Sequence, residues 1–313
     1  MRRLINYLLL FGISCCGRSI VYAQSNTAIL GNPGAVVLDL KVNEARQWLV
    51  ANLGHEIQVW NYESKSLLKS WSVPKIIAID VVQDKVAGVS KSGDVVTWDI
   101  PTGNKLLEQN VSSSPLISVT WIDDTYLVAG SEDGTLVKMN GSTGEVVSKI
   151  THGSAVTAIA CTENKMLITG DEQGMLTMYD VNALALKNSV KGHKSWIRSI
   201  KLSKNNDFIT TSDDGYYAEW TQQLIRVDKN KLHHWVLCSD YSRYENHPMV
   251  VVGKSNGEIE VILLFGRYSI NLDAMVNSVS IIESKQPHIL VAVATYGKGI
   301  QVLDGKDMKF STR

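Results

Sequence analysis

The chain has 313 residues, 44% hydrophobic and 20% charged, and its 31 basic residues equal its 31 acidic residues in number. This composition is typical of a globular protein with a substantial core, and it excludes a disordered or strongly basic chain. A nucleic-acid-binding face needs a basic excess, so no nucleic-acid partner is predicted.

The first residues have the features of a secretory signal peptide. Two arginines precede an apolar run over residues 4–16, and small or aliphatic residues lead to Ala23. We therefore predict a signal peptide over residues 1–23 and a mature domain over residues 24–313. Cleavage there removes three of the 31 basic residues and no acidic one, which leaves a mildly acidic protein.

A lipid anchor is the alternative end of this segment. Ser14-Cys15 resembles the end of a bacterial lipoprotein signal, in which case Cys15 or Cys16 is the only link to a membrane. An uncleaved anchor is the third option, although the apolar run is shorter than the roughly 20 residues that span a bilayer. We expect an exported protein in a bacterial periplasm or at the cell surface, with a lipoprotein as the alternative form.

Only two cysteines, Cys161 and Cys238, follow this segment. Each lies in an alternating apolar run, which favours a buried thiol over a disulfide framework.

The rest of the chain is a repeat of about 40 residues. Seven similar segments recur, six of which end in an apolar residue and a polar one, and their anchor residues lie at intervals of 38 to 42 residues. The anchors are Trp60, Trp98, Met139, Tyr179, Trp220, Ile262 and Leu303.

Each unit contains two apolar runs joined by a tight turn. In units 2 to 6 a glycine lies five residues before the anchor, where a two-residue hairpin needs a positive φ. Further strands precede and follow each pair, and helical periodicity is missing from the sequence. Four strands per unit, seven times over, predict an all-β fold, a seven-bladed β-propeller of four-stranded antiparallel blades.

At this point the chain resembles the WD40 repeat family. The resemblance rests on Gly192-His193, Trp98-Asp99 and the degenerate pairs Tyr179-Asp180 and Leu303-Asp304, and it covers about residues 30 to 313. Units 1, 6 and 7 lack most of the motif. Two segments are candidates for the outer strand of the last blade, Met308 to Thr312 and Thr27 to Leu30.

The resemblance implies a structural hydrogen-bonded tetrad in unit 5. Its members are His193, a hydroxyl of the second strand, Asp214 and Trp220. Thr210 and Ser212 both supply a hydroxyl, and Ser212 is preferred. A closed network of this kind satisfies buried polar groups and fixes the blade, so we assign it no catalytic role.

Two other groups of residues resemble an enzyme or metal site. Gly253 to Gly257 matches the GxSxG nucleophile elbow, but it occupies the predicted hairpin turn of unit 6, whereas the elbow needs a strand, a turn and a helix. His233-His234 with His247 could suggest a metal, but adjacent strand residues point to opposite faces. We predict no catalytic residue, metal or cofactor.

Function in a propeller is expected on its faces, where connecting loops vary. By comparison with the family, the contact face includes residues that open the units on neighbouring blades. The predicted partner-binding residues are Trp196, Arg198, Trp235, Tyr241, Arg243, Met275 and Asn277. Trp and Arg are the types most enriched at binding hot spots.

The sequence thus predicts an exported, monomeric, non-enzymatic propeller that binds a protein partner. A secreted lactonase-like or hydrolase-like propeller enzyme and a carbohydrate-binding propeller are the alternatives.

Overall fold

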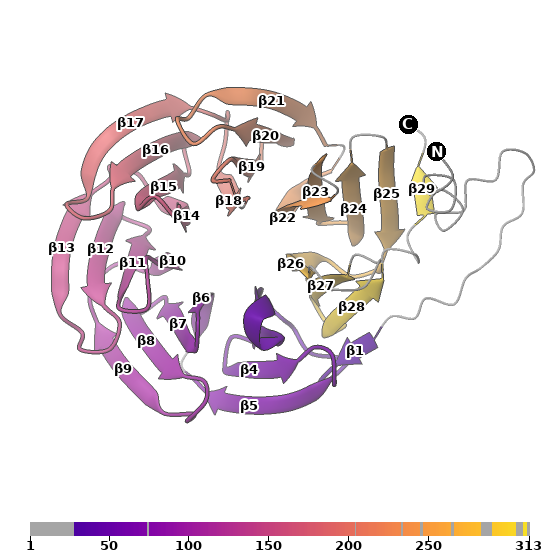
Figure 1. Cartoon of the computed structure of the whole chain (residues 1–313), viewed down its shortest axis with the longest axis horizontal. Coiled ribbons are helices and arrows are strands. Elements are labelled where there is room, and N and C mark those ends of the chain that lie inside the picture. Colours follow the sequence, from indigo (N-terminus) through magenta and orange to yellow (C-terminus); the bar gives the residue numbers. More distant parts are fainter. Residues whose placement is uncertain are drawn as a thin grey trace, which may run out of the picture.

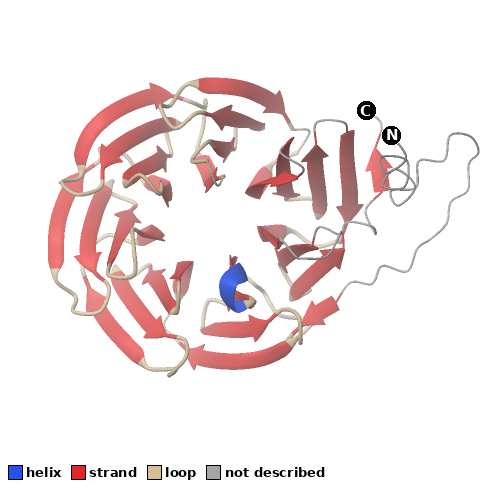
Figure 2. Ribbon diagram, viewed as in Figure 1, coloured by secondary structure: helices blue, strands red, loops and turns tan. Residues whose placement is uncertain are grey.

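The computed structural model of the protein describes residues 28–73, 75–203, 205–232, 234–244, 247–263, 266–282, 290–304 and 309–311. Seven antiparallel sheets are arranged in a ring around a central axis (Figure 1). The described residues contain one short helical turn, η1 (Glu44–Arg46), and otherwise strands and loops (Figure 2). The prediction of an all-β, seven-bladed propeller is confirmed. Within the same residues, no helix is long and apolar enough to cross a membrane.

The strands fall into four concentric layers. The inner strands are β2 (Asp39–Asn43), β6 (Ile76–Val82), β10 (Leu116–Trp121), β14 (Val156–Cys161), β18 (Ile197–Leu202), β22 (Val236–Tyr244) and β26 (Val276–Ile282). The second strands are β3 (Trp48–Asn52), β7 (Lys85–Ser90), β11 (Tyr126–Ser131), β15 (Met166–Asp171), β19 (Phe208–Ser212), β23 (His247–Lys254) and β27 (Leu290–Thr295). The third strands are β4 (Glu56–Asn61), β8 (Asp94–Asp99), β12 (Thr135–Asn140), β16 (Met175–Asp180), β20 (Tyr216–Trp220), β24 (Glu258–Leu263) and β28 (Ile300–Asp304). The outer strands are β5 (Ser66–Ser72), β9 (Lys105–Asn110), β13 (Val146–Thr151), β17 (Ala185–Lys191), β21 (Arg226–Lys231), β25 (Gly266–Asn271) and, in the seventh blade, β1 (Ala28–Leu30).

The hairpins between second and third strands depend on the predicted turn glycines. All five have φ between +80° and +86°. At Gly93 an added Cβ would also lie 1.8 Å from the carbonyl oxygen of Ser112. These turns therefore require glycine for its backbone conformation and, at this position, for its size.

The apolar core lies between blades. The buried apolar residues form seven clusters, and each cluster joins two neighbouring blades. The cluster between the first and second blades, for example, combines Val50, Ile57 and Val59 with Ile79 and Trp98. Each blade is thus one half of two interfaces and has no separate core.

The ring is closed by the N-terminal strand. β1 pairs antiparallel with β28, with Ala28 opposite Val302 and Leu30 opposite Ile300. The C-terminal strand β29 (Lys309–Ser311) pairs instead with β25 and extends the sixth blade. Of the two predicted candidates for the outer strand of the last blade, the N-terminal segment takes this place, and its described residues are Ala28–Leu30.

Carboxylates on the inner strands link neighbouring blades. Asp39, Asp80 and Asp240 each accept a backbone N–H from the next blade. The donors are Ile79 at 3.3 Å, Trp121 at 2.8 Å and Ile281 at 2.7 Å, respectively. Hydrogen bonds to a charged acceptor are among the stronger ones, so they hold the inner layer in register.

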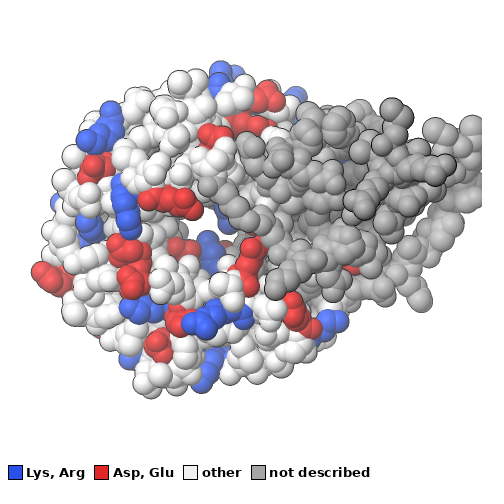
Figure 3. All heavy atoms as spheres, viewed as in Figure 1, with Lys and Arg blue, Asp and Glu red and all other residues white. Residues whose placement is uncertain are grey.

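We call the face on which the inner strands begin the upper face and the opposite one the lower face. Figures 1 and 3 look onto the lower face, where η1 follows β2, and side chains of both charges surround the central opening there. Some pair across blade boundaries, such as Arg46 with Asp84 at 2.7 Å and Lys165 with Asp123 at 3.2 Å.

Candidate functional site

A recurrent bulge shapes the centre of the upper face. In six inner strands the register with the second strand shifts between the first and third residues. The second residue of each of these strands lines the central cavity. These residues are Ile77, Ile117, Thr157, Arg198, Leu237 and Asn277. The bulge therefore presents one side chain per blade to the channel mouth.

A second ring of positions surrounds this one. In five blades the backbone N–H of a hairpin-turn residue donates to the carbonyl of the residue just before the inner strand, at 2.9 to 3.2 Å. The donor and acceptor pairs are Glu132 and Pro115, Glu172 and Ala155, Asp213 and Trp196, Ser255 and Trp235, and Tyr296 and Met275. We call these ten residues the rim.

Three predicted partner-binding residues are exposed on the rim of three consecutive blades. Trp196 is 41% exposed, Trp235 70% and Met275 38%. Tyr296, which the sequence analysis did not single out, is 58% exposed beside Met275. We call these four residues the apolar arc. Exposed large apolar side chains on adjacent blades are typical of an interaction surface.

Other predicted contact residues are placed differently. Tyr241 was predicted to be on the surface, but it is only 7% exposed and packs in the core between the fifth and sixth blades. The reason is that β22 continues to Tyr244, so the segment expected to be a loop is part of an inner strand. Asn277 lines the cavity and donates through Nδ2 to the Val37 carbonyl at 2.8 Å, which links the seventh blade to the first. The side chain of Arg243 lies outside the described residues.

Arg198 is held in a fixed position. Its Nε and one terminal nitrogen donate to the two carboxylate oxygens of Asp213 at 2.7 and 2.6 Å. Its guanidinium carbon also lies 5.1 Å from the centroid of the Trp196 ring. The bidentate pair neutralises this cation, and the stack orients Trp196.

The channel mouth opens into a cavity of about 720 Å³. Its charged lining residues are Asp39, Lys41, Glu132, Glu172, Arg198 and Lys201, and Trp196 forms part of its wall. A volume of this size accommodates a side chain or a short segment of a ligand.

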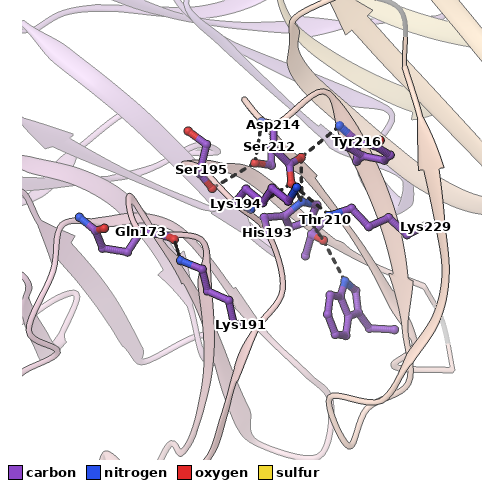
Figure 4. A network of polar contacts seen from close by, with 11 residues as sticks. Gln173, Lys191, His193, Lys194, Ser195, Thr210, Ser212, Asp214, Tyr216 and Lys229 are labelled. Carbon is purple, nitrogen blue, oxygen red and sulfur yellow. Dashed lines mark hydrogen bonds and ion pairs between the residues drawn. The ribbon is translucent and has the colours of Figure 1, made fainter.

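The predicted tetrad exists as a continuous hydrogen-bonded chain (Figure 4). Trp220 Nε1 donates to Thr210 Oγ1 at 2.8 Å, and Thr210 Oγ1 lies 2.7 Å from His193 Nε2. His193 Nδ1 in turn lies 3.1 Å from the Asp214 carboxylate. With a neutral imidazole that carries its proton on Nδ1, every donor in the chain has an acceptor.

The bridging hydroxyl is that of Thr210, and Ser212 lies outside the chain. Ser212 Oγ donates to the Ser195 carbonyl and accepts the Asp214 N–H, both at 3.1 Å, so it supports the turn (Figure 4). The preference for Ser212 as the bridge is corrected.

The charge states follow from the surroundings. Burial lowers the pKa of His193, although Asp214 acts in the opposite direction. Burial raises the pKa of Asp214, but hydrogen bonds from the Lys194 N–H, His193 and Lys229 outweigh it and leave the pKa below its ordinary value. A neutral histidine beside a charged aspartate suits a structural chain that ends at Trp220.

The fourth blade contains a rewired version of this network. His152 Nδ1 lies 2.6 Å from the Tyr179 hydroxyl, and its Nε2 lies 3.5 Å from Asp171. Asp171 comes from the end of β15, and the turn position that is aspartate in the fifth blade is Gln173 here. A repeat that keeps the histidine but changes its partners is consistent with a structural role.

The nucleophile elbow considered for unit 6 does not form. Ser255 lies in the turn between β23 and β24, so no helix follows it to make a nucleophile elbow. Of the histidines considered as metal ligands, His233 and the side chain of His247 lie outside the described residues. In the described residues, no group of three or more His, Cys, Asp or Glu side chains is arranged to hold a metal ion.

The two cysteines are free thiols. Burial raises the pKa of Cys238 to about 12 and that of the half-buried Cys161 to about 11. Both stay protonated near neutral pH. The predicted burial is found for Cys238, whereas Cys161 is only partly buried.

The family profile for the WD domain, G-beta repeat (WD40) matches residues 185–217, the segment that contains His193 and Asp214. Among solved structures, U3-55K superposes with a TM-score of 0.76 over 89% of this chain and 98% of that chain, at 14% identity. This likeness concerns the fold.

Curated relatives match parts of the chain. Autophagy-related protein 16 of Arabidopsis thaliana is 24% identical over 66% of this chain and 43% of its own length. Cilia- and flagella-associated protein 52 of Mus musculus is 27% identical over 44% of this chain and 23% of its own. The WD repeat-containing protein 55 homolog of Dictyostelium discoideum is 24% identical over 39% and 31%. The matched region thus spans less than half of each relative.

The first prediction concerns the bridge. Thr210→Val leaves the Trp220 N–H buried without an acceptor, so we expect the free energy of unfolding to fall by about 1–3 kcal/mol. Ser212→Ala frees the Ser195 carbonyl and the Asp214 N–H, which lie at a half-exposed turn where water can reach them. We therefore expect a smaller loss of unfolding free energy for this variant. Urea unfolding followed by circular dichroism compares the two variants. An equal or larger loss for Ser212→Ala contradicts the assignment.

The second prediction concerns pH. Because the pKa of His193 is lowered on folding from the ordinary 6.5, the unfolded chain binds more protons below that pH. The stabilisation is full above about pH 6.5 and is lost as pH falls toward the folded pKa. A His193→Gln variant should lack this part of the pH dependence in urea titrations. Parallel curves for the two proteins would show that His193 is not responsible.

Proposed function

Because the chain is a WD40-repeat β-propeller, we propose that it is an exported, non-enzymatic interaction protein that binds a protein partner on its upper face. The observation that carries this proposal is the apolar arc of Trp196, Trp235, Met275 and Tyr296 on three consecutive blades.

The arc has the properties of a contact surface. Its members occupy turns and strand starts on a rigid ring, so binding does not require the ordering of a loose segment. Two of the four are tryptophans, which are enriched at hot spots, and Arg198 supports Trp196. On the lower face, by contrast, ion pairs across blade boundaries satisfy several of the charges.

Export is supported by residues 1–23, which combine a positive start, an apolar run and a small residue before the cut. We place the mature protein in a bacterial periplasm or at the cell surface. In the alternative, a lipid on Cys15 or Cys16 anchors the exported protein to the membrane.

The third prediction tests the upper face. A Trp196→Ala, Trp235→Ala double variant should remain folded, since both side chains are exposed, and should lose a protein that the wild type retains in affinity capture from its host envelope. We expect at least about a hundredfold weaker binding for two hot-spot side chains.

A matched control uses the outer belt of the ring. Leu186→Ala, Ile225→Ala removes two apolar side chains that are each 63% exposed, away from the upper face. This variant should capture the partner like wild type. Equal capture by the tryptophan variant and the wild type overturns the assignment of the upper face.

The fourth prediction concerns processing. Intact-mass measurement of the protein from host envelopes should give a chain that begins at Gln24, whereas a lipoprotein begins at Cys15 or Cys16 with an acyl mass increment. Recovery of an unprocessed chain in the cytoplasmic fraction contradicts export.

A further inference from the structure

The channel mouth has an acidic side next to the apolar arc. Glu132 and Glu172 occupy the rim on the third and fourth blades and line the central cavity. Their rim neighbours are small, Pro115 and Ala155, whereas the fifth blade has Trp196 at that place. The two carboxylates therefore face the cavity without a large side chain beside them on their own blades.

Within the described residues, no ion pair joins Glu132 or Glu172 to Arg198, Lys41 or Lys201, the cations that line the same cavity. Arg198 is paired bidentately with Asp213. In the part of the chain that the structure describes, the Glu172 carboxylate accepts one side-chain hydrogen bond, from the Ser154 hydroxyl at 3.2 Å. Among the described residues, no hydrogen bond or ion pair involves the Glu132 carboxylate.

The deeper channel also favours positive charge. Lys41 lines it, and burial alone would lower the pKa of that amine. The pKa is raised instead, because Asp39, Asp80 and Asp240 surround it with negative charge. The carboxylates thus outweigh the effect of burial on Lys41 and hold this amine in its charged form below the mouth.

Trp196 completes the site. It lines the same cavity as Glu132 and Glu172, and the Thr157 hydroxyl fixes the fourth blade to the fifth at this level by donating to the Ile197 carbonyl at 2.6 Å. An indole beside carboxylates suits a guanidinium or ammonium group with an aliphatic stem.

We propose that the channel mouth receives an arginine or lysine side chain of the protein partner, with Glu132 and Glu172 as counter-charges and Trp196 as the apolar wall. This inference rests on the proposed function. It names the chemistry of the partner: a protein segment whose basic side chain enters the channel while its apolar neighbours cover the arc.

The test uses a capped pentapeptide with arginine between two leucines and its analogue in which citrulline, a neutral isostere, replaces arginine. Calorimetry with the whole mature chain should show about tenfold tighter binding of the arginine peptide, an advantage that falls at higher salt. In Glu132→Gln, Glu172→Gln the two peptides should bind equally.

The matched control is Glu145→Gln, Glu163→Gln, which makes the same change of net charge on the lower face, where both residues are exposed in loops. It should keep the preference for arginine. Equal binding of both peptides to the wild type, no binding at millimolar concentration, or an unchanged preference in Glu132→Gln, Glu172→Gln overturns the inference.

The proposed function can fail separately. Suppose that Glu132→Gln, Glu172→Gln captures the partner as wild type does, whereas the tryptophan variant loses it. The proposal that the partner binds the upper face is then supported, and the proposal that its basic side chain enters the channel mouth is contradicted. If neither variant affects capture, both fail.

Discussion

The structure depends on apolar contact between neighbouring blades. A twisted four-stranded sheet has two faces to bury, and in this chain each face packs against the next sheet around the ring. A single blade would expose both faces to water, so the fold gains most of its stability only when the ring is nearly complete. The inner carboxylates and the pairing of β1 with β28 then fix the register of an assembly whose driving force is hydrophobic.

This constraint also explains where variation is possible. The buried layers must keep their size and alternation, whereas the bulge at the start of six inner strands and the adjacent turn are free to carry different residue types. The chain uses this freedom unevenly, with acidic residues on the third and fourth blades and aromatic residues from the fifth onward. The repeat thus supplies a symmetric frame, and the rim residues make one part of the upper face chemically different from another.

Much of the fold was predictable because it depends on local rules: a glycine at each tight turn, alternation along strands and a period near 40 residues. Finer placements depend on register. Thr210 and Ser212 both have buried hydroxyls and lie two residues apart on the same strand. Only the position of the Trp220 N–H, which reaches Thr210, distinguishes them. The polar segment around Tyr241 suggested a loop, yet pairing with β23 extends the strand through it. The bulges have no local sequence signature, and Glu132 and Glu172 become notable only once their turns are superposed.

The closing strand has a consequence for the order of assembly. β1 is the first described strand to be synthesised, but its partner β28 is among the last, so the seventh blade cannot form until nearly the whole chain has left the ribosome. A chain made in this order remains open, with blade faces unprotected, throughout its synthesis. For the export proposed above, the same arrangement would favour passage through a membrane pore as an extended polymer, with the ring completed only after the end of the chain has crossed.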